Sequence, residues 1–382
     1  MKFFHLSDLH IGLKLIGRDL REDQEYILNQ IVEIVVREKP DAIVIAGDIY
    51  DKAIPSAEAV EVFDRFASEL AAAVPNAEIM MISGNHDSAP RVNVFRSVLE
   101  KQRIHMVGNP PQRPEDFLEK VTLRDEYGNV NFYLLPFVKP SMVKQIVGSD
   151  ENGNNLSYDA AVHKLIGREA IDPGERNVLV SHQFYLPVSM DPDKMERMDS
   201  EVRTVGNIDA VKADILERFD YAALGHIHKP MKVGSEVYRY CGTPLACSVS
   251  EAQQPKGIIM VEMRKKGDIK TAILPLAPLR QVRVITGNLD TVLRQGCNDY
   301  VTVVLTDKAD LDVIDMQDRI RLAFPNLLEI RREVLRKADY SRKYTADEQL
   351  DPFELCCSFL SDLEDPEKEL LQDVINCAWE VE

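Results

Sequence analysis

The stretch Ser83-Gly84-Asn85-His86-Asp87 follows the apolar run 79–82 and precedes a turn at Ala89-Pro90. A short apolar run that ends at glycine is typical of a buried strand followed by a tight loop. Asn85 offers a carbonyl oxygen as a hard ligand, and His86 offers a ring nitrogen that can bind a metal or carry a proton. Taken alone, a Gly-Asn-His triplet such as Gly84-Asn85-His86 is more often an ordinary surface loop than a functional site.

Four further motifs place similar side chains at the ends of other apolar runs. The runs are 3–6, 42–46, 178–180 and 221–224, and the motifs after them are Asp8-Leu9-His10, Gly47-Asp48, Ser181-His182 and Gly225-His226-Ile227-His228. In open α/β sheets, ligands bind where the carboxyl ends of the strands meet. The five loops are therefore predicted to form one shared site.

The first third of the chain alternates strand-like and helix-like patterns. Residues 21–38 and 56–73 place apolar side chains at helical spacing, and Ser56 is a plausible N-cap for the second helix. The strand-like runs 42–46 and 79–82 follow the two helices. This alternation predicts a parallel sheet covered by helices.

The middle of the chain shows a different pattern. Residues 121–137 are predicted to form a hairpin, and short strands are expected at 237–241, 257–262 and 269–274. These short strands indicate an antiparallel second half. We therefore predict an α/β fold in which two sheets pack face to face with helices outside. No function is assigned to the irregular segment 187–206.

Pro275 and Pro278 mark a domain boundary. The unit that follows alternates strands and helices and holds none of the candidate ligands. The last segment contains two helix-like pieces, 352–363 and 366–381. A pair so short cannot bury its apolar side chains alone, so it needs a partner, either its own core or another protein. The predicted domains are 1–278, 279–336 and 337–382.

The net charge of −17 argues at first against a nucleic-acid partner. Residues 345–382, however, carry twelve acidic side chains and one basic one, which leaves −6 for residues 1–344. The tail is therefore the part least suited to touch a phosphate backbone. Six cysteines without CxxC spacing fit reduced thiols. No run approaches the roughly 18 apolar residues of a membrane span, so we expect a cytoplasmic protein without a membrane partner.

The residue types in the five loops suit two divalent cations bridged by one carboxylate, an arrangement that can hold a phosphate and activate water. Oxygen and imidazole ligands without thiolates favour manganese, iron or zinc over calcium. Asp48 is the candidate bridge, because a lone Asp after a buried strand and a glycine can approach two ions. The other predicted ligands form two sets: Asp8, His10 and His228 for one ion, and Asn85, His182 and His226 for the other.

His86 is predicted to lie beside the site and outside both ligand sets, as a general acid to the leaving oxygen or as a clamp on the phosphate. Asp51 could orient the His86 ring, although a solvated loop residue is the favoured interpretation. The remaining histidines, His5, His105 and His163, are interpreted as structural.

In their order along the chain, the five motifs match those of the calcineurin-like metallophosphoesterase superfamily. More narrowly, Leu6-Ser7-Asp8-Leu9-His10-Ile11-Gly12, Val180-Ser181-His182-Gln183 and the stretch 220–230 resemble the SbcD family of nuclease subunits. The wider family includes the nuclease of the archaeal and eukaryotic complex for double-strand-break repair. The resemblance extends to 240–245, to Ser250-Glu251, to the unit after residue 278 and to the tail, so it covers nearly the whole chain.

The resemblance implies a four-layer α/β/β/α metallophosphoesterase sandwich with a small α+β capping domain and a C-terminal helical pair. It implies Mn²⁺-dependent DNA cleavage by a two-metal site, as a 3′-to-5′ double-strand exonuclease and a single-strand or hairpin endonuclease, in DNA repair, recombination and replication. It also implies a homodimer formed through helices of the phosphoesterase domain. In a heterotetramer with the SMC-like ATPase SbcC, the tail helices would bind the base of the SbcC coiled coil. Arg91 resembles a DNA-contacting position, with an ordinary surface cation as an equal alternative.

Two other functions stay open on the sequence. The same site could hydrolyse a small phosphodiester or a phosphoprotein, although neither substrate needs a cap domain and a docking tail. The chain could also be a non-catalytic scaffold for an ATPase complex. All seven predicted ligands and His86 are retained, which argues against a scaffold.

Overall fold

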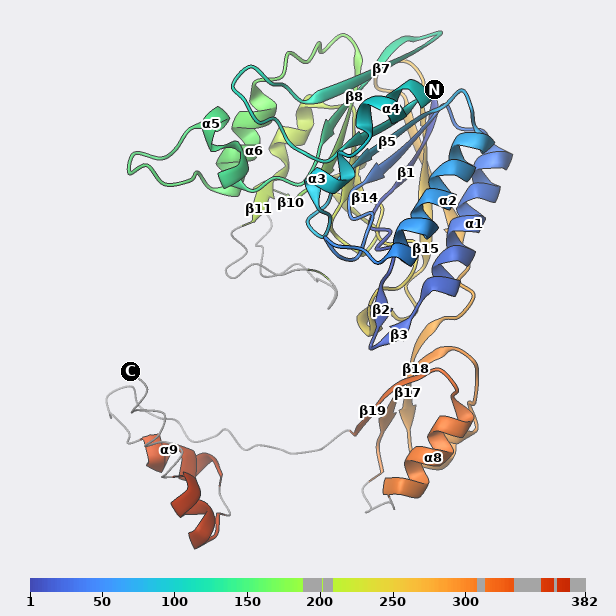
Figure 1. Cartoon of the computed structure of the whole chain (residues 1–382), viewed down its shortest axis with the longest axis vertical. Helices are drawn as coiled ribbons and strands as arrows, with labels where there is room; N and C mark the ends of the chain where they lie inside the picture. Colours follow the sequence, from blue (N-terminus) through green and yellow to red (C-terminus); the bar gives the residue numbers. More distant parts are fainter. Residues whose placement is uncertain (188–200, 202–208, 308–312, 333–351, 361–362, 372–382) are drawn as a thin grey trace. The chain divides into compact units, whose positions relative to one another are not determined.

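The computed structural model describes residues 1–187, 201, 209–307, 313–332, 352–360 and 363–371 (Figure 1). By its internal contacts the chain divides into two compact units, Met1–Glu333 and Val334–Glu382. The division into three domains at residues 278 and 336 stays a prediction. Apart from Pro187 and Glu201, the segment 187–206 lies outside the described residues.

The first sheet has six strands in the order β16-β15-β1-β4-β5-β6. Four strands are mutually parallel because helical crossovers join them, and two strands from later in the chain add antiparallel at one edge. The parallel strands are β1 (Lys2–Leu6), β4 (Ala42–Ala46), β5 (Glu78–Ile82) and β6 (Ile104–Val107), and the edge strands are β15 (Lys256–Met263) and β16 (Ile269–Leu276).

Two long helices cover the outer face of this sheet, α1 (Arg21–Glu38) and α2 (Ala57–Ala73). Their buried apolar side chains pack against alternate residues of the strands, such as Phe4 and Ile43. The Ser56 side chain accepts a hydrogen bond from the Ala59 N–H and caps α2. The structure confirms both predicted helices.

The second sheet has six strands in the order β13-β14-β12-β9-β8-β7. Strands β8, β9, β12 and β14 are mutually parallel, and β7 and β13 pair antiparallel at the two edges. The bounds are β7 (Glu119–Asp125), β8 (Gly128–Leu135), β9 (Arg176–His182), β12 (Tyr221–Gly225), β13 (Met231–Val233) and β14 (Ser235–Tyr240).

The prediction of an antiparallel second half is wrong. The hairpin patterns are correct as local pairs, but β14 also pairs parallel with β12, and the hairpin β15–β16 joins the first sheet through β1. These pairings link segments far apart in the sequence, which a local period of two cannot specify. Both sheets are therefore mixed, and the α/β class is confirmed.

The two sheets bury a common core between them. Phe3 of β1 packs edge-on against Phe132 of β8 and Tyr221 of β12, with ring centroids 5.2 and 5.6 Å apart. On the outer face of the second sheet, α6 (Tyr158–Gly167) buries Val162 and Leu165. Figure 1 shows α1 and α2 on one side of the sheets and α5 and α6 on the other.

Short elements complete this part of the chain. They are β2 (Lys14–Leu15), β3 (Arg18–Asp19), α3 (Ala89–Val92), α4 (Arg96–Leu99), η1 (Glu100–Gln102), η2 (Pro140–Val143), α5 (Lys144–Val147), β10 (Phe184–Leu186), β11 (Ala210–Lys212), η5 (Ala213–Arg218) and η6 (Val249–Glu251).

A third sheet follows residue 278. Its strands β17 (Val282–Gly287), β18 (Tyr300–Leu305) and β19 (Leu327–Arg332) are parallel, and α7 (Leu289–Leu293) and α8 (Val313–Ala323) connect them. Parallel neighbours need crossover connections, and the helices supply them. The unit predicted as α+β is therefore α/β. It contacts α1 through Asp23, whose carboxylate accepts hydrogen bonds from Arg280 at 2.6 Å and Tyr300 at 2.7 Å.

In the second compact unit, α9 spans Pro352–Phe359, and residues 365–371 are also helical. The predicted helical pair is thus seen in part, since residues 361–362 and 372–382 lie outside the described residues. Phe359 and Leu370 expose 76% and 66% of their surface. Among the described residues, no helix is both long and apolar enough to cross a lipid bilayer.

Asp125, at the end of β7, pairs with the buried guanidinium of Arg176, and one of the two hydrogen bonds measures 3.0 Å. Burial raises the pKa of Asp125, but the Arg176 guanidinium, the ammonium of Met1 and the Tyr127 N–H together outweigh burial and hold the pKa well below its usual range. A carboxyl group with a lowered folded-state pKa stabilises the protein fully above its unfolded pKa of about 3.9, and this contribution is lost as the pH falls further.

We expect Asp125→Asn to lower the free energy of unfolding at neutral pH by about 2 kcal/mol, because Arg176 loses its charged acceptor. The difference from wild type should shrink below about pH 4, where the wild-type carboxylate begins to lose its contribution. Urea denaturation at several pH values measures both effects. Asp318→Asn removes an exposed pair with Arg321 and serves as the control. Equal stability of Asp125→Asn and wild type at neutral pH would contradict the prediction.

Candidate metal centre

The seven predicted ligands converge at one edge of the two sheets. Each lies at or just beyond the carboxyl end of a strand, so that both sheets contribute. Asp8 and His10 follow β1, Asp48 follows β4, Asn85 follows β5, His182 ends β9, and His226 and His228 follow β12.

Four of these ligands have a backbone conformation that L-residues rarely adopt. The φ angles are 54° for Asp8, 44° for His10, 50° for Asp48 and 103° for His226. Such residues persist only where the surrounding structure holds them, and they cluster at functional sites. Hydrogen bonds between the loops supply the restraint here: Asp8 N donates to Gly47 O and His10 N to Asp48 O, both at 3.0 Å.

Two glycines allow the loops to approach one another. A Cβ atom at Gly84 would lie 2.0 Å from Asp48 Oδ1, and one at Gly47 would lie 2.3 Å from His182 Nδ1. Gly47 also has a φ of +88°. The glycines in the two motifs are therefore required by close packing at the site.

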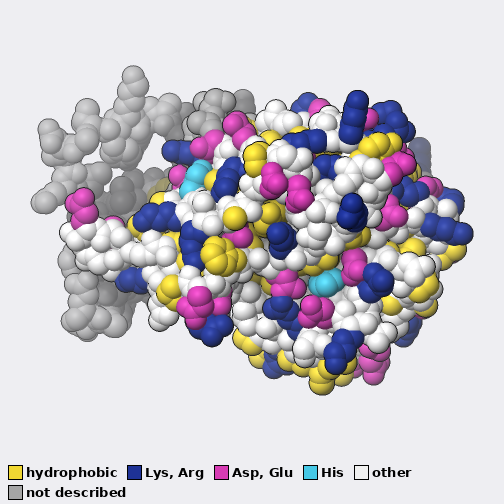
Figure 2. All heavy atoms as spheres, turned by 90° about the horizontal axis from the view of Figure 1, so that it is seen from above, with side chains coloured by type: hydrophobic (Ala, Val, Ile, Leu, Met, Phe, Trp, Pro, Cys, Tyr) yellow, Lys and Arg dark blue, Asp and Glu magenta, His cyan; other side chains and the backbone are white. Residues whose placement is uncertain are grey.

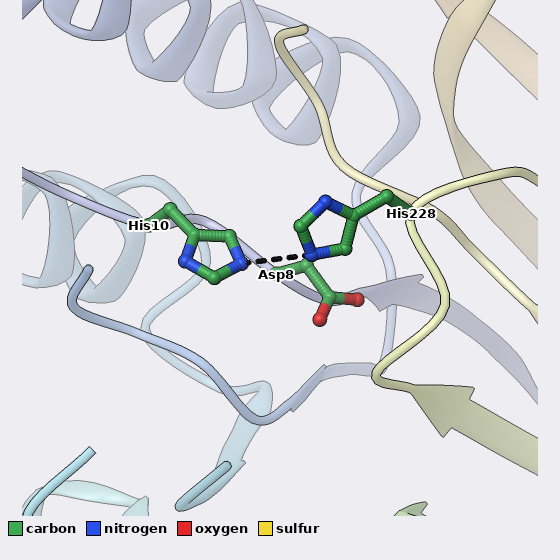
Figure 3. A group of neighbouring side chains, drawn as sticks. All are labelled: Asp8, His10 and His228. Atoms are coloured by element: carbon green, nitrogen blue, oxygen red, sulfur yellow. Dashed lines mark hydrogen bonds between the residues drawn. The ribbon is translucent and has the colours of Figure 1, made fainter. Parts of the chain in front are cut away.

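Asp8, His10 and His228 form the first group of potential ligands, and their side chains point toward one another (Figure 3). His10 Nε2 and His228 Nε2 are 3.1 Å apart, and at most 2% of the surface of each residue is exposed. Burial lowers the pKa of His10 to about 3. A neutral imidazole is the form that binds a metal ion.

Asp48 lies between the two predicted ligand sets. Its Oδ2 is 3.7 Å from His10 Nε2 in the first set and 3.3 Å from His182 Nε2 in the second. Asn85 Oδ1 in turn lies 3.0 Å from His182 Nε2 and 2.9 Å from His226 Nδ1. This is the placement that a bridging carboxylate would need.

Further hydrogen bonds orient the rings and connect the loops. His182 Nδ1 lies 2.7 Å from the carbonyl oxygen of Ala46, so Nδ1 carries the ring proton and Nε2 faces Asp48. The His226 N–H donates to Asp8 Oδ1 at 3.0 Å, and the His86 N–H donates to Asp48 Oδ1 at 2.8 Å. Each carboxylate thus ties its own loop to another.

The buried carboxylates have opposite pKa shifts. Burial raises the pKa of Asp8. Burial would also raise the pKa of Asp48, but the neighbouring histidines, His182 foremost and then His10 and His86, together outweigh burial and lower the pKa. For His182, burial opposes the charged form, yet Asp48 raises the pKa to about 9. Two buried acids among imidazole nitrogens form a donor set of the kind that divalent transition metals bind, so the residues present fit such ions.

His86 lies beside the ligands, with its ring centroid 4.9 Å from that of His10. Its Nδ1 is 2.9 Å from the main-chain oxygen of Asp51. The Asp51 carboxylate instead lies 3.8 Å from His10 Nδ1. The alternative in which the Asp51 side chain orients His86 is therefore wrong, because the backbone carbonyl does so.

Sequence reasoning missed two residues that hold the loops. The Asp87 carboxylate accepts hydrogen bonds from the N–H groups of Ile49, Tyr50 and Gly84 at 2.9–3.0 Å. Its position directly after His86 was the available signal. Gln24 of α1 donates to the His10 carbonyl oxygen at 2.7 Å, and no local pattern marks it.

The three histidines interpreted as structural lie outside the ligand sets. His5 bonds to Tyr221 Oη at 3.1 Å, His105 pairs with Glu78 at 2.8 Å, and His163 lies 3.0 Å from Asp214. A cavity of about 490 Å³ opens beside the site. Its lining comes from the ligand loops and from residues outside the five motifs: Asp51, Lys52, Ala53, Asn85, His86, Phe137, Lys139, Tyr158, Asp209 and His226.

Comparison with known families agrees with this geometry. Residues 1–230, more than half of the chain, match the calcineurin-like phosphoesterase family, and residues 278–363 match the family SbcD_C, described as the type 5 capsule protein repressor C-terminal domain. The SbcD subunit of the nuclease SbcCD from Staphylococcus saprophyticus is 32% identical over 300 residues, which cover 77% of this chain and 74% of that protein.

The chain belongs to the SbcD family of calcineurin-like metallophosphoesterases. It is therefore a hydrolase. Another relative, the SbcD subunit of the nuclease SbcCD from Staphylococcus epidermidis, is 28% identical over 352 residues, covering 90% of this chain and 88% of that protein.

Two solved structures are also similar to the chain at low TM-score. GAP50, the anchor in the inner membrane complex of Plasmodium, has a TM-score of 0.42 and 12% identity, and the match covers 86% of this chain and 96% of that one. A dimetal phosphatase from Danio rerio has a TM-score of 0.37 and 15% identity, and the match covers 72% and 98%.

We expect Gly84→Ala to weaken the binding of a divalent ion at this candidate centre at least about 10-fold, with Mn²⁺ as the probe, because the new methyl group would displace the Asp48 carboxylate. Titration calorimetry measures the affinity. Gly167→Ala is the matched control, since a Cβ atom there meets no other atom within 4 Å. An unchanged affinity in Gly84→Ala would show that the close approach to Asp48 does not matter for binding.

Proposed function

We propose that this SbcD-family protein cleaves DNA phosphodiester bonds at a centre of two divalent ions, with Mn²⁺ as the cofactor. The observation that carries the proposal is the position of Asp48 between two sets of buried oxygen and imidazole donors. Asp8, His10 and His228 would hold one ion, and Asn85, His182 and His226 the other. When bound, such ions polarise a phosphate and supply a nucleophilic water at neutral pH.

His86 is suited to act on the leaving oxygen. A carbonyl oxygen can only accept, so His86 Nδ1 carries a proton toward Asp51 and Nε2 is left for substrate. The ring borders the cavity beside the ligands. We assign His86 the role of general acid or phosphate clamp; in either role the ring is protonated on both nitrogens, so that Nδ1 donates to Asp51 O and Nε2 donates a proton to the leaving oxygen or a hydrogen bond to a phosphate oxygen.

The cavity beside the site supports a nucleic-acid substrate. The rings of Phe137 and Tyr158 offer surfaces on which a base can stack, and Lys52 and Lys139 offer amines for phosphates. A volume of about 490 Å³ suits a small group such as one nucleotide, not an intact duplex. The stacking surfaces and amines favour a DNA strand over a phosphoprotein. Because the cavity holds about one nucleotide, we propose cleavage at DNA ends or in single-stranded hairpins.

The acidic charge of the chain is compatible with DNA because of where it lies. Residues 345–382 carry most of it. Figure 2 shows lysine and arginine side chains interspersed with acidic ones over one face of the molecule. The proposed domains are the nuclease domain 1–278, the cap 279–336 and the tail 337–382, in a cytoplasmic protein.

The tail is proposed to dock on the ATPase SbcC. Within a strongly acidic segment, Phe359 and Leu370 of its helical residues are exposed, as is Leu360 directly after α9. An apolar stripe with an acidic surround suits a groove on a basic coiled coil. The two staphylococcal relatives, which are named as subunits of SbcCD, support this partner.

A homodimer is proposed through the segment around α3 and α4. Val94, Phe95 and Val98 expose 52%, 73% and 59% of their surface. Phe95 also has a φ of 60°, which is unusual for a bulky residue. Three neighbouring exposed apolar side chains are the kind of surface that a second copy of the chain covers.

The proposal predicts that the purified chain degrades an end-labelled duplex in the presence of Mn²⁺, and that His86→Gln does not, because the proton donor is lost. A fall in rate of about 100-fold or more is expected from the usual contribution of general acid catalysis. Gel analysis of the labelled ends, with and without SbcC and ATP, measures the activity. His163→Gln removes a histidine that pairs with Asp214 away from the ligands and is the control.

The same assay separates the alternatives. If the protein turns over a small chromogenic phosphodiester but cleaves no DNA, even with SbcC and ATP, its substrate is a small phosphodiester and not DNA. A wild-type rate in His86→Gln would remove His86 from the chemistry and leave the ligand sets in place.

We expect Phe95→Glu to shift the protein from dimer to monomer in sedimentation velocity, because a charge in an apolar interface loses its hydration without gaining a partner. Leu322→Glu, which alters an exposed leucine on α8, is the matched control and should leave the dimer intact. A dimer that persists in Phe95→Glu would locate the interface elsewhere.

A further inference from the structure

A buried carboxylate outside the proposed ligand sets lies against the imidazole of His228. Glu251 ends the turn η6, and only 1% of its surface is exposed. Its Oε1 is 3.4 Å from His228 Nδ1, and its Oε2 is 2.6 Å from the ammonium of Lys256. Glu251 thus links a proposed metal ligand to a buried cation.

Polar groups of the preceding turn complete the surroundings of Glu251. Thr243 Oγ1 donates to Oε2 at 2.9 Å, and Ser248 Oγ and the Cys247 N–H donate to Oε1 at 3.1 and 3.2 Å. Burial of an ion pair costs several kcal/mol per ion, and packed apolar side chains of similar volume often stabilise a core equally well. Core stability alone therefore does not account for these charges.

The cluster of His228, Cys247 and Glu251 is not a further metal site. His228 Nδ1, Cys247 Sγ and a Glu251 oxygen do lie within 4.8 Å of one another. Lys256 Nζ, however, lies 2.6 Å from Glu251 and 2.7 Å from Thr243 Oγ1, so a positive charge already neutralises the carboxylate. A divalent ion beside this ammonium would be repelled. The cluster supports His228 instead.

We propose that Glu251, held by Lys256, is a positioning residue that fixes the tautomer and the ring orientation of His228; this rests on the proposed metal centre. A carboxylate paired with an ammonium only accepts hydrogen bonds, so His228 Nδ1 carries the ring proton. Nε2 then directs its lone pair toward His10, 3.1 Å away. Partners of this kind orient metal-binding histidines in many sites.

Lys256 restrains His228 from a second side. Its ammonium lies 3.4 Å from the main-chain oxygen of His228, which also accepts the Thr243 N–H at 3.2 Å. One buried cation therefore holds the backbone of His228 directly and its ring through Glu251. Lys256 itself begins β15, a strand paired with β1 that precedes Asp8. The first sheet thereby fixes a histidine that belongs to a loop of the second.

The tautomer is measured directly by ¹⁵N NMR of histidine-labelled wild-type protein without metal, with the His228 signals assigned from His228→Gln. The proposal predicts a proton on Nδ1 and none on Nε2. A spectrum with the proton on Nε2 overturns it, whether or not any variant at Glu251 folds.

The positioning role is tested by Glu251→Leu/Lys256→Met, which removes both charges together and leaves neither one buried alone. Titration calorimetry with Mn²⁺ is expected to show one ion binding about 10- to 100-fold more weakly, with the other unchanged. Glu251→Gln keeps an acceptor oxygen for His228 and should weaken Mn²⁺ binding less than the double variant does. Glu236→Gln, which alters an exposed carboxylate paired with Lys232, is the control.

The outcomes separate this inference from the function on which it rests. Wild-type affinity for both ions in the double variant, together with a native circular dichroism spectrum, overturns the role of Glu251 and leaves the metal centre standing. A wild-type protein that binds no Mn²⁺ overturns the metal centre itself.

Discussion

The hydrogen bonds between the loops after β1 and β4 are the constraint on which the site depends. Asp8, His10 and Asp48 all have positive φ angles, and each such residue costs about 1–3 kcal/mol. The bonds from Asp8 N to Gly47 O and from His10 N to Asp48 O hold this geometry. Because β1 and β4 are adjacent parallel strands inside a closely packed sheet, the loops cannot separate without disrupting the core.

The loops of the second sheet are held by hydrogen bonds to the same two segments, the loop after β1 and the end of β4. The His226 N–H donates to the Asp8 carboxylate, and His182 Nδ1 donates to the Ala46 carbonyl at the end of β4. Side chains and main chain thus join the edges of two sheets whose facing surfaces share one apolar core. Rigid strands on both sides allow seven donor groups to hold fixed positions, which is what a binding centre for small, highly charged ions requires.

The α/β class and the placement of the seven candidate ligands together at one edge could be predicted because each signal is local. An apolar run followed by Asp, Asn or His identifies a strand end, and parallel strands bring their ends together. The pairing of β14 with β12, and of β15 with β1, could not be predicted, because it joins distant segments. The hydrogen bond between His86 and the main-chain oxygen of Asp51 could not be predicted either, because the sequence does not specify where a backbone carbonyl points.

The net negative charge of the chain is unevenly distributed. Residues 345–382 hold −11 of the net −17, and their only basic residue is Lys368. At the centre, Lys256 neutralises Glu251, and Asp8 and Asp48 are the buried carboxylates that belong to the predicted ligand sets. Two buried negative charges repel a phosphate, and cations held between them reverse the sign of the local field. An acidic protein can therefore present a cation-binding edge to a phosphate, because most of its net negative charge lies in residues 345–382.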